Sequence, residues 1–150
     1  MVKKIASTTV LLSAFVLTAC STTPPASSSA VAQLTNKNWI VTHIGNTPIT
    51  SQADVRNIPS LQLDGKANFS GADGCNRIMG SYVASNTKLK LNSVAQTMMA
   101  CVAVNSPDVS KSYTDALAKV SSYQVSEQTL ILKDAAGTAL LQFTSPVQPR

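Results

Sequence analysis

The sequence contains few of the residues that acid–base chemistry and metal binding use. Of its 150 residues, 13% are charged and 5% are aromatic, and histidine and glutamate each occur once, as His43 and Glu127. One histidine cannot build a multi-histidine metal centre, and so few aromatic rings argue against a platform on which nucleic-acid bases stack. These shortages predict a protein that is not an enzyme and that holds no metal ion or other cofactor.

The N-terminus, by contrast, carries a clear targeting signal. Two lysines precede an apolar run that is shorter than the roughly 20 residues of a membrane-spanning helix, and the run ends in Leu-Thr-Ala-Cys at residues 17–20. This tetrapeptide resembles the bacterial lipobox, in which cleavage precedes a cysteine that then receives acyl chains such as palmitate. We predict that residues 1–19 are a lipoprotein signal peptide and that Cys20 is lipidated. The alternative is an ordinary signal peptide in which Cys20 is incidental.

The residues after Cys20 predict the membrane to which the protein is sorted and a flexible tether. Ser21, rather than aspartate, follows Cys20, and by the sorting rule for such lipoproteins this predicts the outer membrane, with the domain facing the periplasm. Residues 20–33 are rich in Ser, Thr, Pro and Ala without charge, which predicts a lipidated cysteine followed by a flexible tether. The folded domain is then expected over residues 34–145, with a frayed tail at 146–150.

Cleavage also changes the charge of the protein. The full chain carries a formal net charge of +5, but Lys3 and Lys4 leave with the signal peptide, so ten basic residues face seven acidic ones. The mature net charge of +3 is spread along the chain without a basic run. We therefore expect no nucleic-acid partner, and expect membrane association through the lipid anchor instead.

Within the domain, alternation of apolar and polar residues predicts short strands. One segment breaks this period: Ser106, Pro107 and Asp108 are typical of a helix start, and apolar residues then recur at helical spacing up to Val120. The predicted fold is α+β and mostly β: a curved antiparallel sheet of six to eight strands, or an incomplete β-barrel, with one covering helix. The predicted strands are 39–44, 60–63, 67–70, 77–83, 88–92, 123–125, 129–132 and 139–143.

Two cysteines lie inside the domain, Cys75 and Cys101. In an oxidising envelope compartment two such thiols more often pair than stay free, and this bridge would close a loop worth about 3.6 kcal/mol in the chain-entropy model. Two alternatives stay open: a pair of inert thiols, and a catalytic thiolate at Cys75 with His43 as its base.

Two blocks centred on these cysteines carry a family resemblance. Residues 71–77, Gly-Ala-Asp-Gly-Cys-Asn-Arg, with Gly80 and Tyr82, resemble the first core motif of the META domain or HslJ-like family. Residues 95–101, Ala-Gln-Thr-Met-Met-Ala-Cys, resemble its second block, with Met98 where arginine is common. The resemblance covers about residues 34–144.

Five residues of these blocks are candidates for a structural motif or a ligand contact: Gly71, Gly74, Asn76, Arg77 and Thr97. The two glycines permit a positive φ or a close backbone approach, and Asn76 can bond backbone groups of the turn through an Asx-type contact. Arg77 can bond carbonyl groups or pair with Asp73.

The resemblance implies a function without an established reaction, because HslJ-like proteins are envelope lipoproteins linked to heat shock and novobiocin tolerance. We expect a non-enzymatic outer-membrane lipoprotein that supports envelope stress tolerance by binding an unknown envelope protein or lipid. The alternative is a pilot or carrier lipoprotein that holds a lipid or a secretin-type partner in an apolar groove. Met98 and Met99 are either core residues or, together with Met79, the lining of such a groove.

Overall fold

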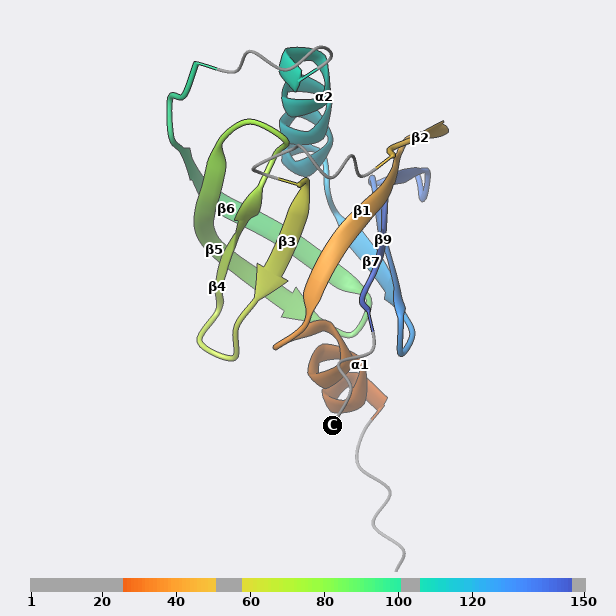
Figure 1. Ribbon diagram of the computed structural model, residues 1–150. Helices are drawn as coiled ribbons and strands as arrows, with labels where there is room; N and C mark the ends of the chain where they lie inside the picture. Colours follow the sequence, from red (N-terminus) through yellow and green to blue (C-terminus); the bar gives the residue numbers. More distant parts are fainter. Residues whose placement is uncertain (1–25, 51–57, 101–105, 147–150) are drawn as a thin grey trace, which may run out of the picture.

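Nine antiparallel strands form one sheet in the part of the chain that the computed structural model describes, residues 26–50, 58–100 and 106–146 (Figure 1). The strands are β1 (Asn38–Ile44), β2 (Thr47–Pro48), β3 (Ser60–Leu63), β4 (Asn68–Ala72), β5 (Arg77–Ser85), β6 (Lys88–Gln96), β7 (Ser122–Val125), β8 (Thr129–Lys133) and β9 (Ala139–Thr144). All eight predicted strands are present. The ninth, β2, has two residues, and so short an element leaves no alternation to detect.

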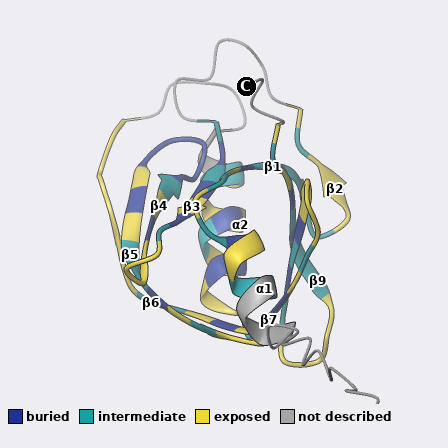
Figure 2. Ribbon diagram, turned by 90° about the horizontal axis from the view of Figure 1, so that it is seen from below, coloured by how far each residue is buried: buried dark blue, intermediate teal, exposed yellow. Residues whose placement is uncertain are grey.

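The sheet curves back on itself, because β1 pairs with β3 along one edge and with β9 along the other. Figure 2, seen from below, shows the strands as a ring with α1 in front of α2 along the direction of view. The ring is weakest between β6 and β7, where Lys88 and Ser122 are the one register pair among the described residues. From Ser93 onward β6 is exposed at every position. The predicted mostly-β fold with a curved sheet is confirmed, as an incomplete ring.

The interior of the ring is filled by large apolar side chains. Inward positions of the strands alternate with exposed ones, as in β3, where Leu61 and Leu63 are fully buried and Gln62 is exposed. The ring of Tyr113 meets that of Phe143 edge-on, with centroids 6.4 Å apart, a geometry that aromatic pairs favour. The largest fully buried side chains are Trp39, Tyr113, Phe143, Leu34, Leu61, Leu63, Ile78, Leu89, Leu117, Leu130, Leu132 and Leu141.

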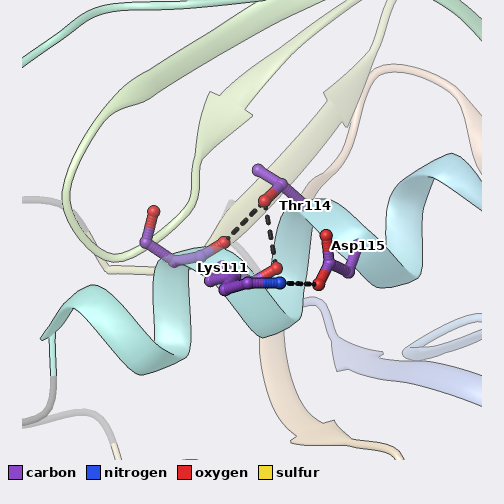
Figure 3. A network of polar contacts seen from close by, with 4 residues as sticks. Lys111, Thr114 and Asp115 are labelled. Carbon is purple, nitrogen blue, oxygen red and sulfur yellow. Dashed lines mark hydrogen bonds and ion pairs between the residues drawn. The ribbon is translucent and has the colours of Figure 1, made fainter.

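The predicted covering helix is α2 (Ser106–Ala118), which contacts β1 and β9. Its apolar stripe faces inward, with Tyr113 and Leu117 buried. On the opposite side the exposed Lys111 pairs with Asp115 one turn later, and the Thr114 hydroxyl donates to the carbonyl oxygen of Lys111 (Figure 3). Because both charged side chains are solvated, this pair adds little stability. Burial of the tyrosine face therefore holds α2 in place.

A second helix, α1 (Ala26–Leu34), lies where the composition predicts a flexible tether, at the other end of the ring from α2 (Figure 1). The segment's alanines favour helix, and Leu34 gives it a buried end: its side chain has 0% exposure, and its carbonyl oxygen accepts a 2.9 Å hydrogen bond from Trp39 Nε1. Packing of Leu34 against the rest of the fold thus stabilises a helix in a segment whose composition alone predicts no regular structure. No helix in the described ranges is long and apolar enough to cross a membrane.

Replacement of Leu34 should show how much the attachment of α1 contributes to the stability of the fold. Leu34→Ala is expected to lower the free energy of unfolding by about 2–5 kcal/mol, because it removes a fully buried side chain and leaves a cavity beside Trp39. The measurement is urea unfolding followed by Trp39 fluorescence. Gln33→Ala, at the exposed neighbouring position, should change the free energy by less than about 0.5 kcal/mol. Equal effects of the two substitutions would contradict the docking of α1 through Leu34.

Candidate functional site

The turn between β4 and β5 is organised by the buried carboxyl group of Asp73, which has 0% exposure. Its Oδ1 accepts hydrogen bonds from the backbone N–H groups of Cys75 at 2.8 Å and Asn76 at 2.6 Å. Its Oδ2 accepts one from the Ser110 hydroxyl of α2 at 2.8 Å. A buried carboxyl group is costly unless its oxygens are bonded in this way. Asp73 therefore ties the turn to the helix.

This geometry differs from the predicted alternatives for Asp73 and Arg77. The carboxyl oxygens bond the turn and α2, and the described part of the chain has one ion pair, between Lys111 and Asp115. An Arg77–Asp73 pair is thus not formed. Asp73 instead influences the hydroxyl group of Tyr113. Burial raises the pKa of this hydroxyl well above its usual range, and the nearby charge of Asp73 raises it further. That hydroxyl donates to the carbonyl oxygen of Ser60 at 3.0 Å.

Positions 71 and 74 of the motif require glycine for different steric reasons. At Gly71 a Cβ atom would lie 2.0 Å from the backbone oxygen of Ser60 on β3, so a side chain would push two paired strands apart. Gly74 has φ +101°, a left-handed conformation, and it packs close to Val109 of α2. Both glycines let the turn and its neighbours approach closely.

Asn76 and Thr97 join the two sequence blocks. Asn76 Oδ1 accepts a hydrogen bond from the backbone N–H of Met99 at 2.9 Å and lies 3.4 Å from Thr97 Oγ1. Thr97 Oγ1 accepts from the backbone N–H of Arg77 at 3.0 Å, and the N–H of Thr97 donates to the Arg77 carbonyl. The Asx-type contact expected of Asn76 is made by Asp73 instead. Asn76 serves a longer-range contact, 23 residues along the chain.

The side chain of Arg77 lies outside this network and lines a groove of about 420 Å³ on the outer face of β1, β3, β4 and β5. The register places Ile40, Ser60, Ala72 and Arg77 in one row across the four strands. A second row, Asn38, Gln62, Ser70 and Met79, runs beside it. Ser60, Ala72 and Ser70 are short side chains at central positions of the rows, and Arg77 and Met79 are longer ones at one end. The groove joins one exposed cation to amide, hydroxyl and apolar groups.

Comparison with known proteins gives the family of this fold and motif. The family model described as the META domain matches residues 32–147. The chain belongs to the META domain family. The match begins two residues before the predicted domain start at 34 and contains both motif blocks. No curated protein matches the sequence.

Solved structures share the META fold of this chain. One is an NMR structure of a protein from Burkholderia xenovorans, 22% identical with a TM-score of 0.62, over 91% of this chain and 100% of that one. Another is the crystal structure of a DUF4847 family protein from Bacteroides vulgatus ATCC 8482, 15% identical with a TM-score of 0.57, over 77% of this chain and 96% of that one. At these identities the likeness concerns the fold alone.

The cysteines of the META motif are described in part. Cys75 is buried, with Sγ 3.5 Å from the carbonyl oxygen of Met99. Cys101 and Cys20 lie outside the described residues, so the Cys75–Cys101 bridge and the lipidation of Cys20 stay predictions. His43, the base of the catalytic alternative, has its Nδ1 3.2 Å from Thr42 Oγ1 on β1. The described contacts of His43 and Cys75 do not bring them together.

The methionines are not core residues. Met98 is 98% exposed, Met99 50% and Met79 53%. Met98 and Met99 follow the open end of β6, and Met79 pairs with Ala95 of that strand. The prediction that Met98 and Met99 fill the core is therefore wrong, because the end of β6 that precedes them is exposed and, among the described residues, β7 pairs with β6 at Lys88 alone.

Within the described residues no three His, Cys, Asp or Glu side chains gather in a way that could hold a metal ion. The expectation that the protein uses no metal or cofactor stays a prediction. Sequence reasoning gave Asp73 no role of its own, although it is the centre of the turn. The signal that could have found it is an aspartate two residues before a cysteine in a glycine-flanked turn, the usual place of an Asx turn.

The close approach at Gly71 can be tested with a matched glycine. Gly71→Ala is expected to lower the free energy of unfolding by about 3 kcal/mol, because the new Cβ would overlap the Ser60 backbone oxygen. Gly65→Ala, in the turn between β3 and β4 where a Cβ meets nothing within 4 Å, should change it by less than about 0.5 kcal/mol. Chemical denaturation of both variants is the measurement. A Gly71→Ala protein as stable as the Gly65→Ala protein would contradict the close packing of β3 and β4.

Proposed function

We propose that this META-family chain is a non-enzymatic outer-membrane lipoprotein that faces the periplasm and supports tolerance of heat and antibiotic stress by binding a partner. One observation carries the binding role. Among the five candidate residues, Arg77 has a charged side chain that takes no part in the turn network and lines an open groove. Gly71, Gly74, Asn76 and Thr97 are accounted for by packing and hydrogen bonds within the fold.

The sequence supports the anchor and the location. The basic residues, short apolar run and Leu-Thr-Ala-Cys of residues 17–20 fit a lipoprotein signal, and Ser21 favours the outer membrane. Several acyl chains on Cys20 would hold the protein firmly, whereas one chain binds membranes only marginally. The helix α1 occupies residues 26–34, which include most of the predicted tether.

Two observations support the disulfide that we propose between Cys75 and Cys101. Cys75 is disulfide-bonded, and its Sγ lies 3.5 Å from the carbonyl oxygen of Met99, two residues before Cys101. The bonds from Asn76 to Met99 and from Arg77 to Thr97 hold the second block at that position. A bridge there would lock together the two blocks of the motif in an oxidising compartment.

The anchor and the binding role can be tested together in cells. In a bacterium whose own copy is deleted, the wild-type chain should incorporate radiolabelled palmitate and restore growth at high temperature and in novobiocin. Cys20→Ala should lose the label because the acylated thiol is absent. Arg77→Gln should keep the label and the protein level but lose the restored growth, since it removes the unpaired cation of the groove.

Lys90→Gln is the matched control for this experiment. Lys90 lies on the exposed side of β6 and outside the groove, so this variant removes one positive charge and should restore growth like wild type. A palmitate label that survives in Cys20→Ala would contradict the anchor. Full growth of the Arg77→Gln strain would contradict the groove as the binding site. Turnover by the purified protein that depends on Cys75 or His43 would contradict a non-enzymatic role.

A second candidate, a pilot role for a protein partner, is favoured by the exposed apolar side chains near the open end of β6. Val94 is 43% exposed and Met98 is 98% exposed, and both lie at or after the part of β6 that β7 does not pair. The filled interior of the ring argues against the lipid-carrier form of this alternative.

Site-specific crosslinking separates the two surfaces. A photo-reactive residue in place of Ser70 in the groove, or in place of Met98, is introduced into the full chain in living cells. The groove-binding role predicts partner adducts from position 70, and the pilot role predicts them from position 98. Lys119, exposed just after α2, is the control position and should give none. Adducts from position 98 alone would favour the pilot role over the proposed one.

A further inference from the structure

The groove over β1, β3, β4 and β5 has a chemistry that narrows the class of ligand it can take. It is lined by residues from four adjacent strands and is open to solvent, and its volume of about 420 Å³ lies in the range of small-molecule and short-peptide sites. Met79 at the rim of the groove pairs with Ala95 of β6.

Among the described residues that line the groove, Arg77 is the one with a charged side chain. The guanidinium of Arg77 is its cation, and the described residues that line it include no carboxylate. Asp73, the nearest acid in sequence, is bonded to the turn and to Ser110. An unpaired arginine is suited to a bidentate pair with one carboxylate, whereas a phosphate with two charges would call for further cations.

The uncharged polar groups suit the backbone of a peptide. Asn38 and Gln62 are register partners on β1 and β3, and their carboxamides can each donate to a peptide carbonyl and accept from a peptide N–H. The hydroxyl of Ser60 lies on β3 and that of Ser70 on β4. Because these floor side chains are short, they leave room for a main chain above them.

The apolar rim gives such a ligand places for small side chains. Ile40 and Ile58 line one side of the groove and Met79 the other. Met79 is 53% exposed, so part of its flexible side chain would be covered when a ligand binds. The mixture of rim, amides and one cation matches neither an acyl chain, which offers no partner for the amides, nor a simple anion, which would leave the apolar rim unused.

We propose that this groove binds a short peptide, with Arg77 holding a carboxylate of the peptide and the carboxamides of Asn38 and Gln62 bonding its backbone. This inference rests on the proposed binding role and names the class of its ligand. The carboxylate belongs either to the C-terminus of the peptide or to an acidic side chain, and the two sources are separable by experiment.

The test is titration of the full chain, ¹⁵N-labelled in detergent micelles, with defined peptides. The probes are N-acetyl-trialanine with a free C-terminus, the same peptide with a C-terminal amide, and N-acetyl-Ala-Asp-Ala amide. The free-carboxylate peptide should shift the amide signals of Ser60, Ser70 and Arg77, with a Kd on the order of 0.1–1 mM for a ligand of this size. Tighter binding of the aspartyl amide peptide than of the free-carboxylate one would assign the contact to an acidic side chain instead.

Matched variants make the result specific to the groove. Arg77→Gln should weaken binding by about tenfold or more, because a hydrogen-bonded charge pair is lost, while Lys90→Gln should change it less than about twofold. Ser70→Phe fills the floor of the groove and should abolish binding, whereas Val83→Phe, on the exposed side of β5 outside the groove, should not. All four positions are exposed, so each variant should keep the urea midpoint of the wild type.

Three outcomes would overturn the proposal. Equal binding of the peptide with a C-terminal amide and the peptide with a free C-terminus would show that Arg77 does not hold a carboxylate. Acetate or inorganic phosphate that binds as tightly as the peptide would show a general anion site. Peptide binding that Ser70→Phe leaves intact would place the ligand elsewhere. If any of these holds while Arg77→Gln still loses stress tolerance in cells, the binding role stands and only the ligand class fails.

Discussion

The hydrogen bonds of one buried carboxyl group hold the distinctive part of this META domain together. Asp73 bonds the backbone of its own turn through one oxygen and Ser110 of α2 through the other. A carboxyl group that is removed from water is stable only where such donors are in place. The turn, the first turns of the helix and the tyrosine beneath them are therefore interdependent, since Tyr113 packs inside the ring and bonds Ser60 of β3.

This constraint separates structure from function within the motif. The close approach at Gly71, the left-handed backbone of Gly74 and the bonds from Asn76 to the second block all serve the turn. The turn in turn fixes the start of β5, where Arg77 stands opposite Ala72 of β4. The backbone of Arg77 belongs to the scaffold through Thr97, and its side chain does not. A rigid scaffold that presents one flexible charged group is a common arrangement for recognition.

The ring is weakest along β6, where the pairing with β7 is confined to the first residue of the strand among the described residues. Near Ser93, which has a positive φ, β6 shifts its register against β5 and then stays paired with it through Gln96. A bulge of this kind bends a strand. The exposed end of β6 and the exposed methionines that follow it lie beyond this bend.

The class of the fold, the eight longer strands and the main helix can be read from the sequence, because alternation and helical spacing depend on which side of each element is buried. The family motif and its glycines are visible there too. The roles of the motif residues, by contrast, depend on tertiary contacts. Whether Asp73 would pair with Arg77 or with Ser110 depends on how α2 lies against the turn, a contact 37 residues away in the chain. The groove also depends on tertiary structure. Its rows of side chains form because four strands pair in one register, and the sequence of a single strand does not specify that register.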